Sequence, residues 1–324
     1  MIHRADYQKL LFDAASASGV LIHLGVTIDS VDVTGTTVKL ADGRKIQADI
    51  IVGADGIKSK VRHSIMGHIE PLDSPNCAFR ATLPAEVMKE DPLMAALFSD
   101  VNANCWIGPG RHIMGYQIRK GVMYNLVMSH PGHGDAGRWS EPGNLEEMKA
   151  CFSGWDPRLT RVLENIPDVL KWKLADLPPL LKWVSGNVVL IGDASHAMVP
   201  YLAQGAAQAI EDGACLAECL ERAQKLEDVP VLLRAFEDIR KPRCEIIQEG
   251  ARSNGDIWHL PDGPAQKQRD RNWERTPEEM RVAAKKDGQD PNRWSDPEFQ
   301  PWLFGYNIVE EVRQQHPEDS AAVD

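Results

Sequence analysis

The chain has 324 residues, 43% of them hydrophobic, and its 36 basic and 47 acidic side chains give a net charge of -11. This length allows one large domain or two ordinary ones with a buried core, and the acidic balance argues against nucleic acid or an anionic membrane as the main partner. The charged start and the lack of 18 uninterrupted apolar residues indicate neither a signal peptide nor a membrane span, so we expect a cytoplasmic protein.

Six cysteines in a chain without a secretory signal are typical of reduced thiols. Cys215 and Cys219 are four residues apart and share one face of a predicted helix. Because no histidine or second cysteine pair stands beside them at ligand spacing, we interpret them as packing residues and predict no metal site.

The first 75 residues combine a helix, a small sheet and a strand. Residues 4–18 have the spacing of an amphipathic helix, which Gly19 ends. The β-branched runs of residues 20–40 predict an antiparallel meander. Residues 49–52 (DIIV) predict a buried strand, followed by Gly53-Ala54-Asp55-Gly56 and a helix with three basic residues. The N-terminus of this helix favours the binding of an anion.

Residues 76–130 form a different layer, because strand-like runs alternate there with short turns around a helical insertion at 84–98. We predict an antiparallel sheet that carries the substrate pocket. Polar and aromatic candidates for lining it are Arg80, Trp106, Tyr116 and Tyr124. Two short helices in 144–166 and a strand in 169–176 then lead back to the sheet.

The segment Gly132–Gly137 (GHGDAG) matches the dinucleotide fingerprint G-x-G-x-x-G. The fingerprint requires a helix that starts inside it, whereas this chain continues as RWSEPGN with Pro142 close behind. We therefore predict a surface loop here.

The central stretch is Val188–Leu220, which predicts a short buried strand, the turn Gly192-Asp193, a loop with Pro200, and a helix opening at Gly205. The carboxylate can accept hydrogen bonds from hydroxyl groups, and the helix N-terminus offers unpaired N–H groups. Alone, this pattern also fits one βα unit of any α/β protein. Two such strand-turn-helix units in one chain favour a nucleotide-type cofactor bound between them.

Residues 228–252 predict a long helix. The last 70 residues are acidic but contain four tryptophans, which favours a segment that docks on the body of the protein.

Three segments, HRADYQKLLFDAA, DIIVGADGIKSKVR and VVLIGDASHAMVPYLAQGAAQAIEDG, resemble the group A FAD-dependent aromatic hydroxylases, especially the salicylate hydroxylase-like monooxygenases. The resemblance implies a mixed α/β fold, with a Rossmann-like FAD-binding domain and an antiparallel substrate-binding sheet. We divide the chain into a partial FAD-binding domain (1–75), the sheet domain (76–178), the return of the FAD-binding domain (179–255) and a tryptophan-rich docking segment (256–324).

Family members begin with a strand, a G-x-G-x-x-G turn and a helix, and nothing before Met1-Ile2 corresponds to them. We therefore expect an incomplete FAD-binding domain. In it the strands at 49–52 and 188–191 would face an empty slot.

Carried over by resemblance, Arg4 contacts FAD, and Asp55 and Gly56 serve both FAD and the nicotinamide cofactor. Asp193 holds the ribityl hydroxyls and Pro200 lies beside the isoalloxazine. The N-terminus at Gly205, Ala206 and Ala207 points at the pyrimidine end. For the catalytic residues, Arg80 resembles an arginine that binds a substrate phenolate in related enzymes, and Tyr116 is the candidate for its assisting tyrosine.

The resemblance implies an oxidoreductase that hydroxylates a phenolic, salicylate-like or polyketide-derived aromatic substrate, with NADH or NADPH and O2 as co-substrates. An alternative from another class is a truncated, non-catalytic product that does not bind FAD by itself. A third is different flavin chemistry, such as halogenation or dehydrogenation.

Overall fold

The computed structural model of the chain describes residues 2–133, 141–276, 278–280, 282 and 292–315. The chain forms two compact units, each assembled from several segments of the sequence. The first comprises Met1–Gly25, Ser74–Leu174 and Trp258–Pro261, and the second comprises Val26–Asp73, Ala175–Ile257 and Asp262–Asp324. The division of the chain into four consecutive domains, made from the sequence, stays a prediction.

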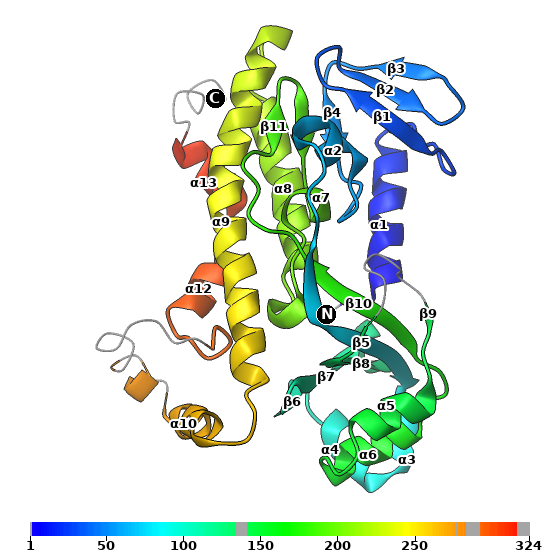
Figure 1. Ribbon diagram of the computed structural model, residues 1–324, viewed down its shortest axis with the longest axis vertical. Coiled ribbons are helices and arrows are strands. Elements are labelled where there is room, and N and C mark those ends of the chain that lie inside the picture. The colour runs from blue at the N-terminus through cyan, green and yellow to red at the C-terminus, as the bar shows by residue number, and fades with distance from the viewer. Residues whose placement is uncertain (1, 134–140, 277, 281, 283–291, 316–324) are drawn as a thin grey trace. The chain divides into compact units, whose positions relative to one another are not determined.

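The first unit is built on a six-stranded sheet with the strand order β6-β7-β8-β5-β10-β9 (Figure 1). The pairs β5–β8, β8–β7, β7–β6 and β10–β9 are antiparallel, which confirms the predicted sheet. Its strands are β5 (Leu72–Pro84), β6 (Ala103–Gly108), β7 (Arg111–Ile118), β8 (Met123–Pro131), β9 (Glu141–Pro142) and β10 (Leu170–Asp176). The glycine-rich segment 132–137 falls mainly on 134–140, outside the described residues.

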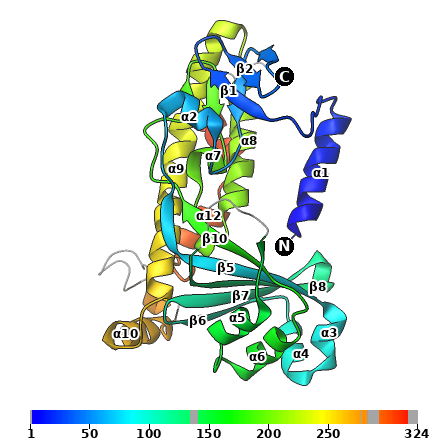
Figure 2. The ribbon, with the colours of Figure 1, turned by 45° about the vertical axis from the view of Figure 1, so that its right-hand side comes forward.

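The two faces of this sheet differ in chemistry. One face carries the buried core of the unit, with Phe79, Tyr124 and Met128 fully inaccessible to solvent. Figure 2 shows four helices beneath β5, β7 and β8, namely α3 (Ala85–Glu90), α4 (Pro92–Phe98), α5 (Leu145–Cys151) and α6 (Pro157–Glu164). Because side chains alternate along a strand, Arg80 and Tyr116 lie on the opposite face.

The second unit contains a small sheet in which β12 (Val188–Leu190) lies between β11 (Val184–Ser185) and β4 (Ile51–Gly53). Of the two strands expected to face an empty slot, β12 has a hydrogen-bonded neighbour on each side, because β4 runs parallel to it on one side and β11 antiparallel on the other. In the described part of the chain β4 is an edge strand of this sheet, and its Val52 is 42% exposed, as the expectation requires. Gly53 permits the approach of β4 to β12: a Cβ there would lie 2.7 Å from Val61 Cβ and 2.9 Å from Leu190 Cδ2. Because the two strands are parallel, the turns that follow them lie at the same end of the sheet.

Long helices pack on this small sheet and supply the core of the second unit. The core residues Val189, Cys215 and Phe236 are fully buried. The helices of the unit are α2 (Lys60–Met66), α7 (Asp193–His196), α8 (Gly205–Leu220), α9 (Val229–Trp258), α10 (Pro264–Trp273), α12 (Phe299–Phe304) and α13 (Ile308–Gln315). Short 3-10 turns are η1 (Arg119–Gly121), in the first unit, and η2 (Pro200–Leu202) and η3 (Leu226–Asp228), in the second.

The C-terminal segment packs on the second unit. Val312 of α13 is fully buried in the core cluster that contains β12. The indole Nε1 of Trp294 donates to the carbonyl of Tyr201 over 2.8 Å. Trp302 lies against the guanidinium of Arg243, 4.6 Å from the ring centroid. Two of the tryptophans thus make the kind of contact that a docked segment requires.

The meander consists of β1 (Ile28–Asp32), β2 (Thr37–Leu40) and β3 (Lys45–Gln47), paired antiparallel as predicted. Residues 20–25, which we expected to begin it, form no strand. Their β-branched and apolar side chains suit a strand, but propensity alone does not hold one without a neighbour to pair with.

The first helix, α1 (Arg4–Ala17), is confirmed, but its expected packing face is not. None of its residues is buried, and Leu10 and Leu11 are 57% and 44% exposed. Sequence periodicity thus predicted the helix correctly and its burial incorrectly. No helix within the described ranges combines the length and apolarity that crossing a membrane needs.

Candidate functional site

The turn after β12 presents a carboxylate with no partner in the described part of the chain. Gly192 adopts a positive φ of 59°, and Asp193 begins the one-turn helix α7 directly behind it. The Asp193 side chain is half-buried, and within the described ranges no donor or cation pairs with it. A carboxylate in this state is available to accept hydrogen bonds from the hydroxyl groups of a ligand.

The N-terminus of α8 also has free hydrogen-bonding groups. This 16-residue helix has no side-chain cap, and the N–H groups of Gly205, Ala206 and Ala207 donate to no acceptor among the described residues. A Cβ at Gly205 would meet only Met198, at 3.9 Å, so the backbone is open to approach. The helix end can therefore bind an acceptor edge or a negative charge. Pro200, in η2 just before it, is half-buried.

The turn after β4 uses its aspartate locally. The Asp55 carboxylate accepts from the Ser59 hydroxyl and from the N–H groups of Lys60, at 2.7 Å, and Val61, at 3.2 Å. It therefore helps to cap α2. Gly56 has a φ of 80°, and nothing lies within 4 Å of where its Cβ would be. The backbone at Gly56 is open to a ligand, whereas the predicted contact of Asp55 with a cofactor stays a prediction.

Arg62 joins the two turns, a role that the sequence did not reveal. We had grouped it with the basic residues expected to favour an anion. Its guanidinium is buried and donates to the carbonyls of Ala194, at 2.9 Å, and Ile57. Burial lowers the pKa of Arg62, and Asp55 partly opposes this. The two strand-turn-helix units are therefore fixed to each other, as their neighbouring strands require.

In the first unit, the face of the sheet opposite the core carries an arginine without a counterion among the described residues. Arg80 stacks on Trp172 of β10, with its Cζ 4.4 Å from the ring centroid. Its Nε is buried and has no hydrogen-bond partner, and no carboxylate within the described ranges pairs with the guanidinium. Burial lowers the pKa of Arg80 and raises that of Tyr116, and the two groups influence each other electrostatically.

Of the candidates in this unit, Arg80 and Tyr116 are thus neighbours, and Arg4 adds positive charge. Trp106 and Tyr124, expected to line the same pocket, lie instead on the core face of the sheet. The charge of Arg4 contributes to the lowered pKa of Arg80. Two guanidinium groups that repel each other, with a phenol beside one of them, suit the negatively charged group of a ligand. Trp172 was missed from the sequence. Its position between Lys171 and Lys173 in β10, an alternation of polar and apolar residues, was the available signal that Trp172 faces the other side of the sheet from the two lysines.

A pair of histidines forms a second polar feature on this face. His112 Nδ1 and His259 Nε2 are 2.7 Å apart, and their rings are stacked with centroids 5.0 Å apart. Burial lowers the pKa of His112 to about 3 and that of His259 to about 4. Both rings are therefore neutral at physiological pH, because a hydrogen bond between two imidazoles needs only one shared proton.

We expect this pair to make the first unit sensitive to mild acid. The unfolded chain takes up protons near pH 6.5 but the folded pair does so only near pH 4 and below, so stability is complete above pH 6.5 and falls between pH 6.5 and 4. The loss should exceed about 1 kcal/mol per pH unit. Hydrogen exchange of the β7 amides in urea at pH 7, 6 and 5 measures this loss of stability.

His112→Phe should reduce the dependence of stability on pH, and the exposed His23→Gln should leave it intact. Equal pH dependence in all three proteins would contradict the assignment.

Comparison with known proteins identifies relatives along nearly the whole chain. The family model described as "FAD binding domain" matches residues 1–251. The FAD-dependent monooxygenase OpS4 of Beauveria bassiana is 36% identical over 95% of this chain and 72% of its own length. The 3-amino-4-hydroxybenzoate 2-monooxygenase PtnB3 of Streptomyces platensis is 34% identical over 84% of this chain and 66% of its own length.

A solved structure has the same fold. The structure titled "Salicylate hydroxylase substrate complex" superposes with a TM-score of 0.75 and 27% identity, over 96% of this chain and 75% of that one. The chain thus spans about two thirds to three quarters of the length of these relatives.

Proposed function

Because the chain belongs to the FAD-binding-domain family that includes the FAD-dependent monooxygenases, we propose that it takes part in the hydroxylation of an anionic aromatic substrate. The single observation that carries the substrate class is Arg80, a cation stacked on Trp172 with a buried Nε that has no partner. The reaction is ArH + O2 + NAD(P)H + H⁺ giving ArOH + H2O + NAD(P)⁺. One oxygen atom enters the ring, and the other is reduced to water.

The residues of the second unit fit a flavin. The unpartnered carboxylate of Asp193 matches the hydroxyl donors of a ribityl chain, and the free N–H groups of Gly205, Ala206 and Ala207 match the carbonyl oxygens of the flavin pyrimidine. When bound, FAD supplies the electron transfer and the activation of oxygen. The helix N-terminus favours negative charge at that edge, which stabilises the reduced cofactor.

The residues of the first unit would orient the substrate. A guanidinium forks onto a carboxylate or phenolate oxygen with two parallel hydrogen bonds, which fixes both the position and the plane of the ring. Trp172 holds the guanidinium plane by stacking. Tyr116 can donate a hydrogen bond to the same oxygen, because its burial raises its pKa and keeps the phenol protonated at neutral pH. A bound phenolate is electron-rich, and its ring is therefore easier to hydroxylate.

The test has two steps, both on the purified 324-residue chain. FAD is titrated first, with quenching of its fluorescence as the readout. Salicylate and either NADH or NADPH are then added, and nicotinamide oxidation is followed together with incorporation of ¹⁸O from O2 into the product. We expect saturable FAD binding and substrate-dependent oxidation with one labelled oxygen. Absence of FAD binding would overturn the proposal and favour the non-catalytic alternative. Oxidation without oxygen transfer would favour a dehydrogenase.

A further inference from the structure

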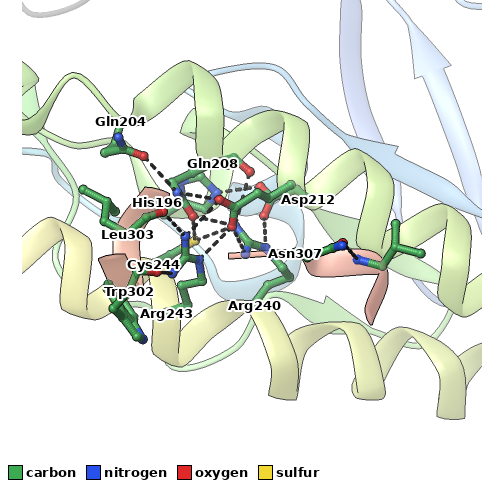
Figure 3. A network of polar contacts seen from close by, with 12 residues as sticks. His196, Gln204, Gln208, Asp212, Arg240, Arg243, Cys244, Trp302, Leu303 and Asn307 are labelled. Atoms are coloured by element: carbon green, nitrogen blue, oxygen red, sulfur yellow. Dashed lines mark hydrogen bonds and ion pairs between the residues drawn. The ribbon is translucent and has the colours of Figure 1, made fainter. Parts of the chain in front are cut away.

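One buried carboxylate holds both ends of the helical turn that carries Asp193. Asp212 of α8 is fully buried, and its Oδ2 accepts from the N–H of Gly192 at 2.8 Å and from His196 Nε2 at 2.6 Å. Gly192 and His196 are the N-cap and the last residue of α7. The turn is therefore fixed onto α8 at two points, on either side of the Asp193 backbone. Figure 3 shows the contact between His196 and Asp212.

A buried arginine connects this carboxylate to the other half of the proposed cofactor site. Arg240 of α9 is completely inaccessible to solvent, and its Nε donates to Asp212 Oδ1 over 2.9 Å. Its Nη2 donates to Gln208 Oε1 over 2.7 Å, and Gln208 Nε2 lies 3.2 Å from the side-chain oxygen of Gln204. Gln204 is the residue before Gly205, where α8 begins. One guanidinium thus links the Asp193 turn to the free N-terminus of α8.

The C-terminal segment completes the network. Glu211 accepts from both Arg240 and Arg243. Arg243 donates to the carbonyls of Trp302, at 3.3 Å, and Leu303, at 3.0 Å. The acidic side chains are therefore matched by arginines, and the segment after α10 is joined to the same set of contacts (Figure 3).

A metal site is the competing interpretation, because ligand atoms of His196, Asp212 and Cys244 lie within 4.8 Å of one another. The position already holds a cation, since Arg240 bonds to Asp212 and its Nη2 lies 3.5 Å from Cys244 Sγ. Burial alone would lower the pKa of His196, but Cys244 and Asp212 outweigh it and raise the pKa well above its usual value. Two cationic side chains disfavour a divalent ion here.

We propose that Asp212 and Arg240 are positioning residues for the cofactor site, which set the place of Asp193 relative to the N-terminus of α8. The inference rests on the proposed function, because it takes the ligand of these two groups to be FAD. Neither residue touches the ligand in this account. Apolar side chains could replace a network that served stability alone. This network instead ends on the Asp193 turn and on Gln204 at the start of α8, the two backbone segments proposed to bind the cofactor.

Asp212→Asn tests the proposal with almost no change in volume. The amide has one oxygen, so it cannot accept from both Gly192 and Arg240. If the oxygen faces Arg240, the Gly192 N–H loses its acceptor; if it faces Gly192, the acceptor is neutral and no longer held by Arg240, so the bond to Gly192 is weakened in either case. We expect hydrogen exchange at the Gly192 amide of the FAD-free chain to rise at least tenfold, and the dissociation constant for FAD to rise at least tenfold. His196→Leu should give the same two changes. His196→Gln, which places a donor where Nε2 was, should restore both to within about threefold.

A matched control separates positioning from general stability. Phe236→Leu alters a fully buried residue of the same core that takes no part in the network, and should lower the thermal midpoint without changing exchange at Gly192. Wild-type exchange at Gly192 in Asp212→Asn would overturn the inference, as would equal loss of FAD affinity in Phe236→Leu. Failure of the wild-type chain to bind FAD, with the exchange pattern as expected, would instead overturn the proposed function.

Discussion

Replacing Asp193 with alanine is expected to weaken FAD binding by at least 100-fold. The carboxylate is half-buried and has no partner in the described part of the chain, so its hydrogen-bonding capacity is available to the cofactor. Hydrogen bonds to a charged group contribute about 1.5–3 kcal/mol each, and two of them correspond to about 100-fold or more in affinity. Titration of the variant with FAD, followed by fluorescence quenching, gives the dissociation constant directly.

Two further variants make this result specific. Asp238→Ala removes another carboxylate of the second unit, an exposed one on α9, and should leave the affinity for FAD unchanged. Asp193→Asn keeps one acceptor oxygen without the charge and should fall between wild type and Asp193→Ala. Thermal unfolding of the FAD-free proteins should differ little, because within the described ranges the Asp193 side chain has no hydrogen bond or ion pair that alanine would remove. An unchanged dissociation constant in Asp193→Ala would show that this carboxylate does not hold the cofactor.

The Asp193 turn could be predicted from the sequence because its signals are local. A run of four apolar residues, a Gly-Asp pair and a series of small residues at helical spacing specify β12, the turn and α8 in order. The strands β6, β7 and β8 were equally accessible, since they follow one another along the chain with short turns between them, whereas the place of β5 and β10 beside them depends on residues far away in the sequence. Elements of this kind depend on neighbours within a few residues.

Features that depend on distant partners could not be predicted in the same way. Asp212 and Arg240 are 28 residues apart, on two helices, and nothing in the spacing shows that they meet. The contact of Asp55 with a cofactor stays a prediction, and the capping of α2 by its carboxylate is a further role that the nearby Ser59 could have suggested. The direct pairing of β4 with β12 depends on the close contact at Gly53. Sequence patterns show which residue types are present, whereas the partner of a buried charge is decided by packing.

Arg80 gives the second large prediction, because no carboxylate among the residues that the structure describes matches its charge. A partly desolvated guanidinium without an anion is costly, and burial lowers the pKa of Arg80 accordingly. A carboxylate or phenolate would offset that cost, and a neutral ligand would not. The residue should therefore discriminate between aromatic ligands by charge. Arg119, an exposed arginine of the same unit that pairs with Asp6, offers a control in which only a surface ion pair is lost.

Replacing Arg80 with methionine is expected to lower the affinity for salicylate by about 100-fold and the affinity for its neutral amide, salicylamide, by less than threefold. A bidentate, partly buried arginine–carboxylate pair contributes about 3 kcal/mol, which corresponds to the loss of about 100-fold in affinity expected for salicylate. Arg80→Lys keeps the charge but loses the fork and the stacking on Trp172, so it should recover only part of the affinity. Equilibrium binding measured by quenching of tryptophan fluorescence checks each variant, with Arg119→Met as the control that stays at wild-type affinity. Equal losses for the acid and the amide in Arg80→Met would mean that Arg80 shapes the sheet face rather than binding the anion.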